Sequence, residues 1–118
     1  PGKGQTTPAL TAKFLDIANP LKVICAHLGG GLPFYAHMPE IRTLITNAMF
    51  DTAAAPFLYE PSVIKTICEI LSPKHVLFGS DYPLISQSRA LEYVKNSGLD
   101  EEMKSMVLGA NAMSLYNL

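Results

Sequence analysis

The sequence predicts an α/β fold built on a parallel sheet. Three short apolar stretches alternate with helix-like segments, which is typical of strands joined by crossover helices. The stretches are continuously apolar, so we expect both faces of the sheet to be covered. The chain has 118 residues, of which 48% are hydrophobic, and this is long enough to form one core.

The chain is predicted to begin with a loop followed by a helix. Residues 1–8 (PGKGQTTP) contain two glycines and two prolines and start without a Met, which suggests a fragment or a processed chain. After them, Leu10 and Phe14 stand at helical spacing. Thr7 can cap this helix and Asn19-Pro20 can end it, so about three helical turns are expected.

The next unit is a strand, a glycine run and a second helix. Residues 22–27 (KVICAH) form the first predicted strand, which three glycines end. The helix is predicted to begin near Pro39, because proline fits the first helical turn. A second strand is predicted within residues 48–56 (AMFDTAAAP).

The third unit repeats this plan. Pro61 is predicted to open a helix, Ser72-Pro73 to end it, and residues 75–81 (HVLFGSD) to form the third strand. Three further helices are predicted after this strand: one over residues 86–96, one from Asp100 and a last one from Asn111.

Composition and charge exclude several classes of protein. Nine basic and ten acidic residues are spread along the chain, without the clustered Lys and Arg typical of nucleic-acid or anionic membrane surfaces. No apolar run approaches the roughly 20 residues that span a bilayer. We expect a cytoplasmic protein without nucleic-acid or membrane partners, in which Cys25 and Cys68 are reduced core residues.

Polar side chains stand at the end of each predicted strand, next to very small residues. His27 precedes a glycine run, Asp51 precedes Thr-Ala-Ala-Ala, and Asp81 follows Gly-Ser. The carboxyl ends of parallel strands carry the sites of α/β folds, and small neighbours leave room for a ligand. The sequence therefore predicts a small-molecule pocket at this edge of the sheet.

His27 and Asp81 are the residues expected to carry the chemistry. Asp81 could cap the next helix, but Ser86 is better placed for that role. His27 could be a core histidine satisfied by the backbone, but its position before the glycines favours a role in the site. Together the two side chains would form a pair of metal ligands or an acid and base pair.

Other residues near the strand ends have two interpretations each. Asp51 either lines the pocket or hydrogen-bonds its own turn, which begins with Thr52. Tyr35 and Tyr82 could stack on a planar substrate or only roof the pocket. We take these four as candidate pocket-lining residues, whereas His75, which precedes its strand, is expected to be structural or exposed.

The glycine run itself is not expected to bind phosphate. Residues 29–34 (GGGLPF) lack the third glycine of a dinucleotide-binding loop, and Pro33 interrupts the helix start that would supply N–H groups. We expect the glycines to let the backbone pass close to a ligand or bend beside the site.

Four stretches, taken in order, resemble the carboxyl-terminal half of the amidohydrolase superfamily. They are VICAHLGGGLPFYAHMPE, FDTAAAP, VLFGSDYP and GANAMSLYNL, and together they cover nearly the whole chain. The branch related to aminocarboxymuconate-semialdehyde decarboxylase is the most similar. The resemblance implies a (β/α)₈ barrel with one or two divalent metal ions at its mouth, and zinc is the metal we expect.

The resemblance also implies roles for individual residues. Asp81 corresponds to the aspartate after the eighth strand, a metal ligand that handles the proton of bound water. His27 corresponds to the histidine after the sixth strand, which binds metal, activates water or polarises the substrate. Asn111-Ala112 matches the terminal helix, where it is a packing element.

Part of the family's metal site is missing from these residues. The chain contains no HxH motif, and a catalytic zinc usually takes three protein ligands. A full barrel needs about 250 residues. We therefore expect residues 1–118 to be a single structural unit, a barrel fragment that carries roughly the sixth to eighth strand and helix units.

The expected parent activity is metal-dependent hydrolysis of a small cyclic amide, ester or acidic substrate. Asp81 would accept the proton of metal-bound water, and His27 would orient the water. Non-oxidative decarboxylation with the same metal is the alternative reaction. A third alternative is a non-catalytic fragment that self-associates or pairs with the missing half barrel, because both edges of a three-stranded sheet would be unpaired.

Overall fold

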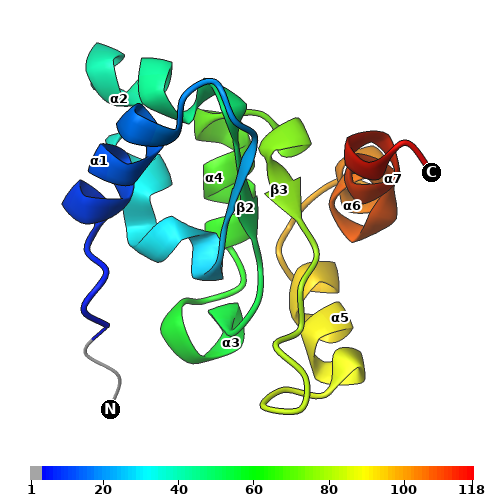
Figure 1. The fold of residues 1–118 in the computed structure, drawn as a ribbon. Coiled ribbons are helices and arrows are strands. Elements are labelled where there is room, and N and C mark those ends of the chain that lie inside the picture. The colour runs from blue at the N-terminus through cyan, green and yellow to red at the C-terminus, as the bar shows by residue number, and fades with distance from the viewer. Residues whose placement is uncertain (1–3) are drawn as a thin grey trace.

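The centre of the chain is a sheet of three parallel strands in the order β1-β2-β3 (Figure 1). The computed structural model describes residues 4–118, so the start of the predicted opening loop, residues 1–3, lies outside the described residues. The predicted parallel α/β class is confirmed. The strands are shorter than predicted: β1 is Val23–Cys25, β2 is Ala48–Asp51 and β3 is Val76–Leu77.

Helical segments precede, connect and follow these strands. Side chains cap three of them where the sequence predicted it: Thr7, Ser86 and Asp100 each accept a backbone N–H of the first turn. The segments are α1 (Pro8–Ala18), η1 (His27–Tyr35), α2 (Pro39–Leu44), η2 (Ile45–Asn47), α3 (Ala55–Leu58), α4 (Val63–Ile70), η3 (Pro73–His75), α5 (Gln87–Lys95), α6 (Glu101–Ser105), η4 (Met106–Ala110) and α7 (Asn111–Tyr116).

One helix start differs from the prediction, and another helix continues directly from the turn before it. The helix expected from Pro61 begins at Val63, after the additional short helix α3. The last helix, α7, begins at Asn111 as predicted, but Ala110 before it already has helical dihedrals and the π-helical turn η4 joins α6 to α7. The Asn111 side chain instead donates hydrogen bonds of 2.8 Å to the carbonyl oxygens of Pro73 and Val76.

The core lies between one face of the sheet and the helices that pack on it. Phe50 in β2 and Ile64 and Ile67 in α4 are fully buried there, and Leu15 of α1 joins them. The other face is more open: Ile24 in β1 is 41% exposed. The prediction that both faces are covered is therefore wrong for β1 in the described chain, because alternate side chains of a strand point to opposite faces.

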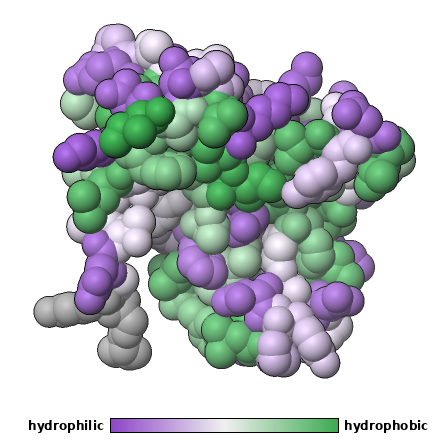
Figure 2. Space-filling model, in the orientation of Figure 1, coloured by the Kyte–Doolittle hydropathy of each residue, from purple (hydrophilic) through white to green (hydrophobic). Residues whose placement is uncertain are grey.

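Apolar side chains also gather on the surface over α1 and the strands (Figure 2). Leu10, Phe14 and Ile17 of α1 are each more than half exposed. They recur along one face of the helix at the spacing that a buried stripe would have. Among residues 4–118, no helix is both long and apolar enough to cross a membrane.

The outer edge of β3 is covered, contrary to the expectation of two unpaired edges. The Phe78 N–H donates to the carbonyl of Val107 at 2.9 Å, and the carbonyl of Val76 accepts from Asn111. The end of the chain therefore satisfies this edge, and Figure 1 shows α7 beside β3. Within the described residues, β1 pairs with β2 alone, so its other edge is the open one.

Candidate functional site at the strand ends

The parallel register brings the three predicted site residues to one edge of the sheet. Cys25 lies opposite Phe50, and Asp51 lies opposite Leu77. His27 therefore follows β1 at the level where Asp51 ends β2, and Asp81 follows β3 on the same side. This is the carboxyl edge, where α/β folds place their ligands.

Two hydrogen bonds tie His27 to the end of β2, and a third closes the set within the turn after β2. Its backbone N–H donates to Asp51 Oδ1 at 3.0 Å, and its ring Nδ1 lies 2.8 Å from the carbonyl oxygen of Ala53. The N–H of Ala53 donates to the same Asp51 Oδ1 at 3.0 Å. We call these three bonds the Asp51 bracket. They bear out the interpretation that Asp51 hydrogen-bonds its own turn.

The bracket determines which ring nitrogen of His27 is free. A carbonyl oxygen can only accept a hydrogen bond, so Nδ1 carries the hydrogen that faces Ala53. In the neutral imidazole, Nε2 then keeps its lone pair. The half-buried His27 can thus bind a cation or accept a proton at Nε2.

The backbone after β1 runs through a left-handed turn. His27, Leu28, Gly29 and Gly30 have φ between 54° and 62°, and φ of Gly31 is 95°. A Cβ on Gly29 would lie 2.8 Å from the Phe50 ring, so this glycine also allows close packing on the core. Bending beside the site, one of the two roles predicted for the glycines, is confirmed.

Thr52 joins β2 to β3 and does not line an open pocket. Its hydroxyl donates to the carbonyl of Gly79 and accepts the Gly79 N–H, both at 3.1 Å. Only 2% of the residue is exposed. The expectation that Thr52 faces substrate is wrong in this structure, because both hydrogen-bonding capacities of its hydroxyl are used on the backbone.

Asp81 lies in the loop between β3 and α5, with its side chain exposed. Its φ is 62° and its carbonyl accepts the N–H of Leu84 at 2.8 Å. Ser86 caps α5 through Arg89, as predicted, so capping does not account for Asp81. The backbone of Asp81 is thus left-handed, and such conformations cluster at functional sites.

The two tyrosines occupy different places. Tyr35 is 52% exposed and lines a hollow with Pro8 and Met38, which is not the hollow that contains His27. Tyr82, next to Asp81, is 72% exposed. Tyr35 therefore lines a different hollow from His27, whereas Tyr82 is the chain neighbour of Asp81.

His27 lines a hollow of about 790 Å³ along the open edge of β1. Its walls include apolar side chains of α1 and β1, and residues of the left-handed turn also line it. The residues that line it include Leu10, Phe14, Ile24, His27, Gly30 and Tyr59. The pKa of Cys25, also in this wall, is raised to about 11, first by burial and then by the charge of Asp51.

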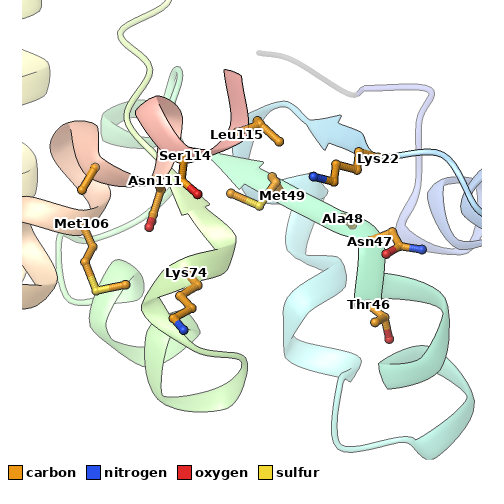
Figure 3. Close-up of a pocket in the computed structure, with 11 residues that line it drawn as sticks. Lys22, Thr46, Asn47, Ala48, Met49, Lys74, Met106, Asn111, Ser114 and Leu115 are labelled. Carbon is orange, nitrogen blue, oxygen red and sulfur yellow. The ribbon is translucent and has the colours of Figure 1, made fainter. Parts of the chain in front are cut away.

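A second hollow, of about 460 Å³, lies at the opposite ends of the strands (Figure 3). Its lining comes from η2, the amino end of β2, η3, η4 and α7, and it includes Lys22 and Lys74. His75 also lies at this end and its Nδ1 is 2.8 Å from the Ala48 carbonyl, so the predicted structural role is confirmed. This hollow is remote from the carboxyl edge.

The side chains of His27 and Asp81 at the carboxyl edge are of the types that bind divalent cations, but two ligands are too few for a complete site. Imidazole nitrogen and carboxylate oxygen are common ligands of such ions. Within residues 4–118, however, no group of three or more His, Cys, Asp or Glu side chains could hold a metal. His27 and Asp81 can thus supply part of a metal site.

Parallel strands joined by helices, with a histidine and an aspartate at their carboxyl ends, define this chain as part of a (β/α)₈ barrel. It belongs to the amidohydrolase family, whose sequence model matches residues 5–118. The predicted superfamily and partial barrel are both confirmed.

Relatives in two fungi are similar in sequence. A 6-methylsalicylic acid decarboxylase of Penicillium expansum is 31% identical over 124 residues, which cover 91% of this chain and 38% of that protein. One of Aspergillus aculeatus is 25% identical over 116 residues, with 80% and 35% covered. The chain thus spans little more than a third of the length of these relatives.

Solved structures of decarboxylases share the fold. The 5-carboxyvanillate decarboxylase of Sphingomonas paucimobilis matches with a TM-score of 0.73 at 20% identity, covering 92% of this chain and 37% of that one. A dihydroxybenzoic acid decarboxylase of Polaromonas sp. JS666, solved with manganese and an inhibitor, matches with a TM-score of 0.76 at 19% identity. That match covers 94% of this chain and 38% of the other.

Proposed function

We propose that the protein carrying this chain is a metal-dependent, non-oxidative decarboxylase of a small aromatic acid, with hydroxybenzoic acids as the substrate class. The observation that carries the proposal is the 31% identity to a 6-methylsalicylic acid decarboxylase across 91% of the chain. Because these relatives are decarboxylases, decarboxylation is favoured over the hydrolysis that the sequence alone predicts. As a cytoplasmic enzyme, it would act on a soluble acid.

His27 and Asp81 are the proposed reacting and binding residues. In decarboxylation, the bond between the ring carbon and the carboxylate breaks, CO₂ leaves, and a proton takes its place on carbon. The free Nε2 of His27, which the bracket leaves with a lone pair, takes up a proton and delivers it to that carbon. Asp81 contributes its carboxylate to the cation.

A divalent cation at this edge would hold the substrate oxygens and stabilise the negative charge that develops on them. Zinc was expected from the sequence, and the manganese in one structural neighbour supports a divalent ion without favouring zinc. The remaining ligands would come from parts of the barrel outside residues 1–118. A chain of this length alone is therefore proposed to be inactive.

The open edge of β1 and the apolar face of α1 support a further proposal about partners. Leu10, Phe14 and Ile17 are exposed beside an unpaired strand edge. We expect this surface to pack against the rest of the barrel, or against a second copy when the chain is alone. Light scattering that shows a monomer with metal-stimulated turnover would contradict this.

The reaction is tested with the intact protein loaded with Zn²⁺ or Mn²⁺. We expect CO₂ release from 6-methylsalicylic acid or a dihydroxybenzoic acid, and loss of that activity on chelation. Esters and cyclic amides serve as the comparison substrates. Metal-stimulated hydrolysis of these, without CO₂ release from any aromatic acid, would reject the decarboxylase proposal in favour of the hydrolase.

The site is tested by two substitutions in the same protein. Asp81→Asn should abolish turnover and lower the metal content, whereas His27→Asn should lower turnover about 10²–10⁴-fold with little loss of metal. Asp16→Asn and His37→Asn, at exposed positions, are the matched controls. Full activity and full metal occupancy in Asp81→Asn would reject the assignment of Asp81 as a metal ligand. Loss of metal in His27→Asn would show that His27 is itself a metal ligand.

A further inference from the structure

We infer that Asp51 is a positioning residue, which holds His27 in one ring orientation and one tautomer through the Asp51 bracket. The inference rests on the proposed role of His27 in the reaction, but its geometry is independent of the substrate. It assigns Asp51 a role other than binding substrate or metal.

The bracket is a closed set of contacts between two strand ends. A single atom, Asp51 Oδ1, accepts the N–H of His27 from the β1 side and the N–H of Ala53 from its own turn. The carbonyl of Ala53 then accepts from His27 Nδ1 at 2.8 Å. The backbone of His27 is therefore held by Asp51, and its ring is held by Ala53, which Asp51 also holds.

The backbone conformation of His27 explains why such an anchor is needed. His27 and Leu28 have φ of 56° and 54°, a left-handed conformation that residues with a Cβ disfavour. Such conformations persist where surrounding contacts hold them in place. The bond from His27 N–H to Asp51 lies at the first residue of this turn, where it stabilises the departure from β1.

What the bracket needs from Asp51 is an oxygen acceptor at one position. Both N–H groups meet Oδ1, and asparagine has an oxygen at the same place. A carboxylate that bound a cation or exchanged protons would need its charge. The Asn and Ala variants therefore separate a positioning role from a catalytic one.

The activity test uses the intact, metal-loaded protein. Asp51→Ala should lower kcat on the order of 100-fold, the loss expected when a reacting group is misplaced by about 1 Å. We expect KM and metal content to change little in this variant. Asp51→Asn should lose less than about tenfold in kcat, because the charge-assisted bonds weaken but remain.

The matched control removes a carboxylate of the same structural kind elsewhere. Asp100 accepts the N–H of Met103 at 2.8 Å as the cap of α6. Asp100→Ala should lower the midpoint of urea unfolding without changing kcat. An equal loss of kcat in both Ala variants would reduce Asp51 to a general stability residue and overturn the inference.

A second readout does not depend on turnover. In the metal-free intact protein with ¹⁵N-labelled histidine, long-range ¹H–¹⁵N spectra report the tautomer of each ring, and His27→Asn assigns the His27 signals. We expect the Nδ1–H tautomer in the native protein and in Asp51→Asn, and a mixture in Asp51→Ala. This holds even if the substrate proposal fails.

Two results would overturn the inference. One is an unchanged His27 tautomer in a folded Asp51→Ala protein. The other is loss of metal, or of rate to the level of His27→Asn, in Asp51→Asn. If Asp51→Ala does not fold, Asp51→Asn decides alone: the native tautomer with less than about tenfold loss of kcat supports positioning.

Discussion

Thr52 and Gly79 exchange two hydrogen bonds, each 3.1 Å long, between the end of β2 and the loop that follows β3. The Thr52 side chain is buried, so its hydroxyl is protected from exchange with water. This pair ties the segment that leads to Asp81 to the turn that holds His27. Both proposed site residues thus depend on one junction.

Loss of this hydroxyl should destabilise the junction. Thr52→Val leaves the Gly79 N–H and carbonyl without their partner, and we expect about 1–3 kcal/mol less free energy of unfolding. Thr52→Ser keeps the hydroxyl and should recover most of that loss. Urea denaturation of both variants checks this, and equal stability of Val and Ser would contradict the role of the bonds.

A side chain at Gly79 should destabilise the fold, because Ala53 lies against this glycine. A Cβ at Gly79 would lie 3.2 Å from the Cβ of Ala53 and 3.3 Å from its nitrogen. Since the Ala53 nitrogen belongs to the Asp51 bracket, Gly79→Ala should lower the thermal midpoint and disturb the His27 ring signals. The overpacking should cost about 1–3 kcal/mol.

A second glycine provides the control for this substitution. Gly109 lies in the helical turn η4, and a Cβ there meets nothing within 4 Å. Gly109→Ala should be neutral or raise stability by about 0.4–1 kcal/mol, because alanine restricts the unfolded chain. If Gly109→Ala lowered stability more than Gly79→Ala, contact with Ala53 would not be the cause of the destabilisation.

Asn111 should be important for the fold although it lies far from the predicted chemistry. It is 8% exposed, and its amide donates 2.8 Å bonds to Pro73 and Val76. Asn111→Ala removes both bonds, and although the Pro73 carbonyl still accepts the N–H of Val76, the free energy of unfolding should fall by about 1–3 kcal/mol. Asn47→Ala, at an exposed position, is the control in the same urea titration and should change little.

The two buried thiols should resist modification and should make stability fall at high pH. Burial is the main cause that raises the pKa of Cys25 and of Cys68 from 9.0 to about 11. At pH 8 the thiolate fraction, and with it the rate of reaction with a disulfide reagent, should be about 100-fold lower than for a free thiol.

The pH dependence has a definite sign. A raised pKa means that the unfolded thiols ionise first, so their contribution to stability is complete below pH 9 and is lost as pH rises toward 11. Urea midpoints measured from pH 8 to 11 should fall over this window. The double variant Cys25→Ala, Cys68→Ala should fall less steeply, and an identical slope would contradict the assignment.

Local patterns were sufficient for the order of the predicted strands and helices and for several helix starts. Caps such as Thr7, Ser86 and Asp100 act within one helical turn, so a few neighbouring residues reveal them. The apolar runs also located the three strands, although each strand is shorter than predicted. The parallel topology also predicts that His27 and Asp51 lie at the same, carboxyl edge of the sheet.

Long-range contacts were not predictable from these patterns. The bond between His27 and Asp51 joins positions 24 residues apart, and that between Asn111 and Pro73 joins positions 38 apart. Asn111 looks like a helix cap in the sequence because its side chain can bond either to nearby N–H groups or to a distant carbonyl. Only packing of α7 against β3 selects the second.

The sequence was therefore enough to identify a parallel α/β segment, its family resemblance and two candidate reactive residues, since spacing and residue type are local properties. The folded chain decided that Asp51 and Thr52 are hydrogen-bonded to the backbone, that Tyr35 and His27 line different hollows, and that the β3 edge is covered. Each of these outcomes depends on which distant groups meet when the core forms, because buried polar groups take the partners that packing brings to them.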